Sequence, residues 1–354
     1  MRAVVLRNGE LIVAEQPEPA PGEGQVLVRT RTCGICGTDL HARHHLANFL
    51  DGMTRSGSHL PTDPRADVVF GHEFCGEILD HGPNTDQRLA PGTLVVGLPY
   101  ITGPAGAEYV GYSNRFPGGF AERMVLTERL LFPVGNGLSA DHAALTEPFA
   151  IGEHAVARAR VPEDARIMVV GCGPIGLAVI AALKARGLGP VVAIDFSPAR
   201  RRFAEAMGAD IVVDAADETQ ASVWARIGNR KQRAVAFECV GRPGVVQHII
   251  EELPRNGFVV VVGNVLEPSS IDQVIAFNKE IDICFAQNYT SGEFRSTLDN
   301  IAEGRIDVTP VLTGIVPPEG VAAGFDALAD PEKHAKIIVS FDVPAPDISD
   351  HISD

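Results

Sequence analysis

A strand, a glycine-rich turn, a helix and a second strand follow one another between residues 166 and 195, and this order constrains the fold more than any other feature of the chain. The first strand is apolar almost throughout, as in strands that are buried on both faces of a parallel sheet. The turn after it has the spacing G-x-G-x-x-G, which between a strand and a helix is typical of a dinucleotide site. The six residues of the turn are Gly171, Cys172, Gly173, Pro174, Ile175 and Gly176.

The residues around this turn indicate how a nucleotide would be held. Gly173 has no side chain where a pyrophosphate must approach, and the N–H groups at the start of the helix face the same position. Asp195 ends the second strand, where a carboxylate accepts hydrogen bonds from the ribose hydroxyls of NAD and repels the 2′-phosphate of NADP. Three arginines at 200–202 could attract a phosphate, but on a helix they would largely face solvent. We therefore expect NAD rather than NADP.

Patterns along the chain divide it into two parts. From 151 to 287 apolar strands alternate with helices, which predicts a doubly wound parallel sheet. Residues 1–150 instead show short alternating segments between Gly and Pro, as in β structure, and 288–354 fit that region better than another α/β repeat. We expect an α/β protein with a β-rich domain from 1–150 and 288–354 and a dinucleotide-binding domain from 151–287, with 342–354 as a loosely held tail.

Composition excludes several classes of function. Thirty basic and 45 acidic residues give a net charge of 30 − 45 = −15, which argues against a nucleic-acid or anionic-membrane partner. No apolar run is long enough to span a bilayer, and the first residues lack a secretory signal, so we expect a cytoplasmic protein with reduced cysteines. Of the six cysteines only Cys33 and Cys36 form a C-x-x-C pair, and no second pair completes a four-cysteine zinc knuckle.

Reactive side chains gather in three short segments that are far apart in the sequence. Residues 32–41 hold a thiol, a hydroxyl, a carboxylate and an imidazole within ten residues. The second segment has His72 and Glu73 side by side, and the third, 145–150, contains Glu147. One thiolate, one imidazole and one carboxylate suit a three-ligand catalytic zinc with an open fourth position. Spacing alone does not establish such a site, since a C-x-x-C is also compatible with a redox pair or half of a zinc knuckle.

The motifs, taken in order, resemble those of the zinc-dependent alcohol and polyol dehydrogenases of the medium-chain dehydrogenase/reductase superfamily. The resemblance runs from Arg2 to about Phe341. It implies a GroES-like catalytic domain built from both ends of the chain, a Rossmann domain between them, and reversible hydride transfer between a secondary alcohol or polyol and NAD. The motifs that carry it are CGICGTDLH (33–41), GHEFCGEI (71–78), GGFAE (118–122), TEPFAIGEHA (146–155), VVGCGPIGL (169–177) and FECVG (237–241).

The resemblance assigns roles to individual residues near the metal. It implies that Cys36 and His72 are zinc ligands and that Glu147 occupies the third ligand position. Glu73 stands where a glutamate can approach the metal or exchange onto it. Asp39 matches a carboxylate that orients the ligating imidazole of His72.

Other residues receive roles in proton transfer and nucleotide binding from the same resemblance. Thr38 and His41 match a proton relay, which is needed because zinc lowers the pKa of a bound alcohol and the proton must then leave a dry site. Arg200 matches a basic residue that contacts the adenosine ribose. Cys33 and Cys75 match positions that are usually not ligands, so we expect them to be small buried residues.

Two regions depart from the pattern of the family. Many relatives bind a second, structural zinc through four closely spaced cysteines, but residues 97–119 contain none, so we expect one catalytic zinc per subunit. Residues 42–70 show no clear period and are interpreted as a loop over a cleft or as surface elaboration. The three histidines in that stretch, His44, His45 and His59, are expected to be solvated.

The family also suggests a homodimer or homotetramer that is joined through the Rossmann domain and acts on a small-molecule alcohol. Two other functions remain open from the sequence: a zinc-free NADPH-dependent reductase of the same fold, and a non-catalytic nucleotide-binding protein. The presence of all the ligand and relay residues counts against both.

Overall fold

The computed structural model describes residues 1–57, 60, 62–103 and 106–343, and within them the chain forms two compact units. Among the described residues, the first unit contains 1–147, 312–329 and 336–343, and the second contains 148–311 and 330–335. The tail expected over 342–354 lies outside the described residues from 344 onward. No helix within these described ranges is both long and apolar enough to cross a membrane.

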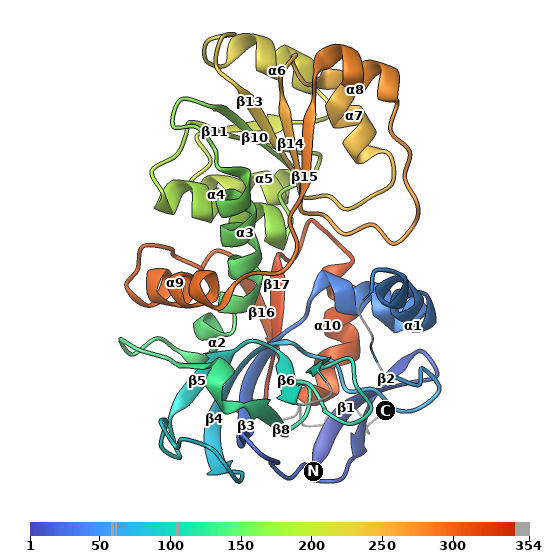
Figure 1. Ribbon diagram of the computed structural model, residues 1–354, viewed down its shortest axis with the longest axis vertical. Coiled ribbons are helices and arrows are strands. Elements are labelled where there is room, and N and C mark those ends of the chain that lie inside the picture. The colour runs from blue at the N-terminus through green and yellow to red at the C-terminus, as the bar shows by residue number, and fades with distance from the viewer. Residues whose placement is uncertain (58–59, 61, 104–105, 344–354) are drawn as a thin grey trace, which may run out of the picture. The chain divides into compact units, whose positions relative to one another are not determined.

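The first unit is built on a seven-stranded sheet (Figure 1). Cys33 in β3 lies opposite Val339 in β17, and Gly34 at the end of β3 lies opposite Glu73 at the start of β4. This register brings the ends of three strands together, although they are far apart in the sequence. Along the main path the order is β16 (Leu312–Val316), β17 (Lys336–Ser340), β3 (Gln25–Gly34), β4 (Glu73–His81), β5 (Leu94–Gly97) and β9 (Leu131–Pro133), with β8 (Arg123–Thr127) also paired to β3.

Smaller elements complete the first unit. Two antiparallel pairs are β1 (Arg2–Arg7) with β2 (Glu10–Glu15) and β6 (Tyr100–Gly103) with β7 (Gly106–Tyr109). The short helices are η1 (Glu128–Leu130), α2 (Ala140–Ala143), η2 (Pro318–Gly320) and α10 (Val321–Leu328). The β structure expected over 1–150 is present as far as Pro133, apart from one long helix and η1, and is followed by helices.

That helix, α1 (Gly37–Arg55), occupies a stretch that was expected to have no regular structure beyond residue 42. The expectation was wrong as far as Arg55. A capping box between Cys36 and Asp39 starts the helix, which is kinked at His45. His44 and His45 are exposed, as expected, whereas His59 lies outside the described residues. The buried residues recur every three or four positions, as a helix requires: Asp39, Ala42, Leu46, Phe49 and Leu50.

The second unit is a parallel sheet of six strands, which confirms the doubly wound α/β fold. In chain order the strands lie 3-2-1-4-5-6, so the first strand, β10, and the fourth, β13, are neighbours where the order reverses. Ligands of such sheets bind at the carboxyl ends of the strands near this switch point. The strands are β12 (Ile211–Asp214), β11 (Val191–Asp195), β10 (Arg166–Val170), β13 (Ala234–Glu238), β14 (Phe258–Val261) and β15 (Asp282–Phe285).

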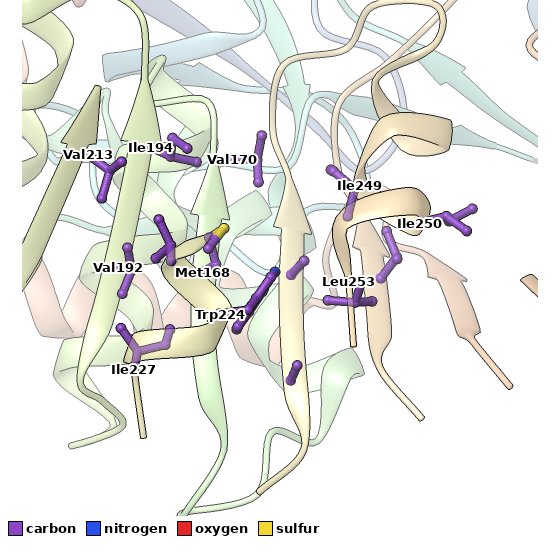
Figure 2. Close-up of a cluster of buried hydrophobic side chains, with 14 of the residues drawn as sticks. Met168, Val170, Val192, Ile194, Val213, Trp224, Ile227, Ile249, Ile250 and Leu253 are labelled. Atoms are coloured by element: carbon purple, nitrogen blue, oxygen red, sulfur yellow. The ribbon is translucent and has the colours of Figure 1, made fainter. Parts of the chain in front are cut away.

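Helices cover both faces of this sheet (Figure 1). On one face α6 (Gln220–Arg226), α7 (Val245–Glu252) and α8 (Gln273–Lys279) pack on the strands, and α6 buries Trp224 in the centre of the shared core (Figure 2). On the other face lie α4 (Pro174–Ala185) and α5 (Pro198–Ala206). The alternation of strands and helices expected over 151–287 is therefore present.

The two remaining helices, α3 (Thr146–Ala159) and α9 (Ser291–Ala302), show where the boundaries between the two units lie. α3 begins in the first unit and continues into the second, close to the boundary expected at residue 150. The return to the first unit was expected at 288 but occurs at Leu312. The reason is α9, which buries Phe294, Leu298 and Ile301 in the second unit. An amphipathic pattern predicts a helix but does not specify the core against which it packs.

Candidate active site

Cys36 lies at the junction of β3 and α1, where it is the N-cap of the helix. Its Sγ accepts a hydrogen bond from the backbone N–H of Thr38 at 3.5 Å, and its own N–H donates to Oδ2 of Asp39 at 3.2 Å. A thiolate is favoured at a helix N-terminus because the N–H groups there carry partial positive charge. The strand-to-helix junction therefore holds the Cys36 sulfur in a defined position and favours its thiolate form.

His72 and Glu73 come to the same place from the start of β4. The donor atoms of Cys36, His72 and Glu73 all lie within 4.8 Å of one another. This approach requires Gly34, because a Cβ at that position would lie 2.1 Å from Oε2 of Glu73. The structure thus joins residues that are 36 positions apart in the sequence into one cluster.

The charges around His72 fit a divalent cation. Nδ1 of His72 lies 3.6 Å from Oδ1 of Asp39, and both side chains are buried. Burial by itself would lower the pKa of His72, but the negative charges of Asp39, Cys36 and Glu147 raise this pKa well above its usual value. A thiolate and carboxylates around one buried imidazole are the donor set of a catalytic zinc site, so the residues present fit that ion.

Glu147 is a further carboxylate near this cluster. It is buried in the first turn of α3, and its charge contributes to raising the pKa values of His72, Lys336 and Tyr109. It therefore lies near the cluster, although the group of atoms within 4.8 Å contains Glu73 instead. Both glutamates named in the sequence analysis are thus close to Cys36 and His72.

Lys336 pairs with Glu73, and the sequence analysis did not single it out. Its Nζ donates to both carboxylate oxygens of Glu73 at 2.7 Å and to the carbonyl of Ile35 at 3.0 Å. The Lys336 side chain is 2% exposed, yet the charge of Glu73 holds its pKa above the usual value. A signal was present, because a lysine in a strand whose other residues are all apolar or small needs a buried partner.

The glycine-rich turn in the second unit has the geometry expected of it. Gly171 has φ +93°, a conformation that side chains disfavour, and a Cβ at Gly176 would lie 1.9 Å from the carbonyl oxygen of Gly171. Gly173 is the N-cap of α4 and offers no side-chain cap, so the first N–H groups of the helix stay available to an anion. The turn therefore has the features that a phosphate-binding site requires.

Asp195 and the arginines after it surround this turn. The two carboxylate oxygens of Asp195 each accept a backbone N–H at 2.8 Å, Oδ2 from Cys172 and Oδ1 from Ser197. Arg200 reaches back over the turn, with Nη1 3.9 Å from Oδ2 of Asp195. Arg201 forms an ion pair with Asp214 at 2.7 Å. The expectation that 200–202 would largely face solvent thus holds only for residue 202, because the first turn of α5 packs against the end of β11.

Comparisons with known proteins agree with this geometry. Residues 22–136 match the model of the alcohol dehydrogenase GroES-like domain, and 174–303 match the zinc-binding dehydrogenase model. A (R,R)-butanediol dehydrogenase of Bacillus subtilis (strain 168) is 32% identical over 92% of this chain and 94% of its own length. The chain belongs to the zinc-dependent alcohol and polyol dehydrogenases of the medium-chain dehydrogenase/reductase superfamily.

Further relatives of this dehydrogenase support the same family. A sorbitol dehydrogenase of the same Bacillus strain is 30% identical over 88% of this chain and 89% of its own length. The crystal structure of 2R,3R-butanediol dehydrogenase from Bacillus subtilis superposes with a TM-score of 0.81 at 29% identity, covering 96% of this chain and 99% of that one. The resemblance inferred from the motifs is therefore confirmed over nearly the whole chain.

The residues expected to relay protons both lie in α1. Thr38 is half-buried and His41 is exposed, and because they are three positions apart in α1 they lie on the same side of the helix. Cys33 and Cys75 are fully buried, as expected, and burial raises the pKa of each thiol. Neither belongs to the group of donor atoms formed by Cys36, His72 and Glu73.

Glu238 is a further residue that the sequence analysis did not single out, although it lies in the quoted motif 237–241. It ends β13 beside β10, at the switch point of the sheet, and its side chain is fully buried. Its Oε1 accepts the N–H groups of Val240 and Gly241 at 2.8 Å each, and burial raises its pKa. Glu238 thereby shapes the loop beside the glycine-rich turn.

Proposed function

We propose that this dehydrogenase transfers hydride reversibly between a secondary alcohol or polyol and NAD, using a single zinc ion held by Cys36, His72 and Glu147. The observation that carries the proposal is the convergence of thiolate, imidazole and carboxylate groups on one buried place in a chain that also has a complete dinucleotide turn. The named relatives support the substrate class, since one is a butanediol dehydrogenase and one a sorbitol dehydrogenase.

Glu147 is proposed as the third ligand because it matches the third ligand position of the family and its charge acts on His72. Both oxygens of Glu73 accept hydrogen bonds from the buried Lys336, which compensates its charge. Glu73 remains near enough to Cys36 and His72 to approach the ion or exchange onto it. Asp39 orients His72 through the pair at 3.6 Å.

Proton transfer is assigned to Thr38 and His41. When bound, zinc lowers the pKa of the alcohol hydroxyl that it contacts. Thr38 accepts the proton beside the metal ligands, and the exposed His41 passes it to solvent. Replacement of His41 by Gln should lower the turnover number by about 100-fold or more and leave zinc content unchanged. An unaltered turnover number in that variant would remove His41 from the relay.

The coenzyme is proposed to be NAD rather than NADP. The carboxylate of Asp195 is largely buried at the end of β11, where it would repel a 2′-phosphate. Arg200 is close enough to Asp195 to contact the same ribose. Arg201 is already engaged by Asp214 and by the carbonyls of Asp195 and Phe196, which leaves it poorly placed for a phosphate.

One zinc ion per subunit, a cytoplasmic location and a homodimer or homotetramer complete the proposal. All six cysteines are free, and residues 97–119 contain none that would hold a second zinc. β15 ends the order of the parallel sheet, and Phe285 on it is 66% exposed. Phe277 on α8 is 82% exposed. An open strand edge next to apolar side chains suits pairing with a second copy of this chain, which light scattering would test.

The experiment that tests the proposal is an NAD-linked screen of polyols, aliphatic secondary alcohols and cyclic alcohols on protein of measured zinc content. We expect NADH formation with at least one class and about one zinc per chain. Activity that persists undiminished after complete chelation would favour a zinc-free reductase. Absence of turnover with every alcohol and with both coenzymes, on protein that is loaded with zinc, would favour a non-catalytic nucleotide-binding protein.

A further inference from the structure

Three of the four tyrosines of the chain lie between residues 97 and 119, the segment that lacks cysteines. Two of them face His72: the ring centre of Tyr112 lies 5.6 Å from that of His72, and the ring centre of Tyr109 lies 5.8 Å away. Tyr100 packs edge-on against Tyr109 at 4.9 Å. The segment therefore brings an aromatic cluster to the proposed metal site.

Tyr112 differs from its neighbours because it makes a direct polar contact in this cluster. Its hydroxyl donates to Oδ1 of Asp39 at 2.6 Å, a short bond of the kind made to a charged acceptor. The same Oδ1 lies 3.6 Å from Nδ1 of His72. Oδ2 of Asp39 is occupied by the N–H of Cys36. Asp39 thus connects Tyr112 to both proposed ligands, Cys36 and His72.

Packing holds the Tyr112 ring in this orientation. The ring lies 4.9 Å from Phe49 in α1 and 5.4 Å from Phe70, and the residue is 2% exposed. The backbone carbonyl of Tyr112 accepts the hydroxyl of Thr62 at 2.5 Å. Asp39 is fully buried, so water cannot readily replace the Tyr112 hydroxyl as its donor.

We propose that Tyr112 is a positioning residue of the metal site: its hydroxyl fixes the Asp39 carboxylate, and Asp39 in turn fixes the ring of His72 and the N-cap Cys36. The proposal rests on the proposed function only in taking zinc as the bound ion. Removal of the hydroxyl leaves a buried carboxylate oxygen without its donor, so Asp39 is free to turn and the orientation of His72 is lost. Groups that orient a metal ligand in this way contribute about 10-fold to 100-fold to metal affinity.

The test compares Tyr112→Phe with Tyr109→Phe. Both substitutions remove one hydroxyl from a ring against His72, but the Tyr109 hydroxyl makes no hydrogen bond to a protein group in the described part of the chain. We expect Tyr112→Phe to release zinc to a chromophoric chelator about 10-fold faster or more, and Tyr109→Phe to match the wild type. In cobalt-substituted protein, the thiolate-to-cobalt and d–d absorption bands should shift in Tyr112→Phe only.

A double-mutant cycle with Asp39→Asn separates this role from a general effect on folding. If Tyr112 acts through Asp39, Tyr112→Phe should change zinc release little further in the Asp39→Asn background. Equal losses in Tyr112→Phe and Tyr109→Phe, or an unaltered release rate and cobalt spectrum in Tyr112→Phe, would overturn the proposal. Wild-type protein that binds no zinc would instead overturn the proposed function, so the two failures are distinguishable.

Discussion

The two proposed binding regions of this dehydrogenase are built in opposite ways. The dinucleotide region is nearly contiguous in sequence, from Gly171 to Arg200, and depends on backbone: a glycine with positive φ, free N–H groups and a close approach of helix to strand. The metal region draws on residues from Cys36 to Lys336 and depends on buried charges. A local backbone site is specified by small residues at fixed spacing, whereas the metal site needs several strands and helices in register.

Loss of one metal ligand should have the largest effect and should separate the two regions. In Cys36→Ser the hard hydroxyl replaces a soft thiolate, so zinc should be lost and turnover should fall by about three orders of magnitude or more. NADH affinity, measured by fluorescence, should stay within about 2-fold, since the turn lies in the other unit. Cys284→Ser in β15 is the matched control and should retain zinc and activity. Unchanged turnover in Cys36→Ser would refute the proposed mechanism.

Gly176→Ala should have the opposite effect, with loss of coenzyme binding and retention of zinc. A Cβ would lie 1.9 Å from the carbonyl oxygen of Gly171, so the helix and turn must move apart and coenzyme affinity should fall about 100-fold or more. Zinc content should be retained. Gly292→Ala in α9, where the nearest atom to the added Cβ is 3.9 Å away, is the control and should bind NADH normally. Normal coenzyme binding in Gly176→Ala would contradict the view that backbone approach defines this site.

Lys336→Met tests whether buried charge defines the metal region. Glu73 would then be a buried carboxylate without its partner, which costs about 3–5 kcal/mol of unfolding free energy. Added zinc should restore more of the melting temperature in this variant than in the wild type, because the cation can compensate Glu73. The exposed Lys333→Met serves as the control and should melt like the wild type. An apo-variant as stable as the wild type would argue that the pair with Glu73 is dispensable.

The smallest effect is expected from Asp195→Asn, which alters one charge in the dinucleotide region. The amide keeps the shape of the side chain but no longer repels a 2′-phosphate, so kcat/KM with NADP relative to NAD should rise by about 10-fold. Asp210→Asn, a carboxylate that also accepts a backbone N–H at 2.7 Å but lies before β12, should leave the preference unaltered. An unaltered preference in Asp195→Asn would show that charge at this position does not select the coenzyme.

Several structural errors of the sequence reading have physical causes. The spacing of Ala42, Leu46 and Phe49 does indicate a helix, but the charged, polar and histidine residues between them obscure the period. Cys36 caps the helix, although cysteine is not among the residues preferred at an N-cap. Residues 288–311, which include α9, were assigned to the β-rich domain, because an amphipathic pattern does not identify the surface against which a helix packs.

By itself the amino-acid sequence determined the parallel sheet, the glycine-rich turn with Asp195, and the kinds of side chain available to a metal. These features follow from local spacing, which covalent geometry converts directly into structure. Only the tertiary structure decided that Lys336 neutralises Glu73, that Tyr112 holds Asp39, and that Glu238 supports the loop at the switch point. Each of those contacts joins a buried charge to a group brought there by strand pairing or loop packing, and a buried charge selects its partner by distance in space rather than in sequence.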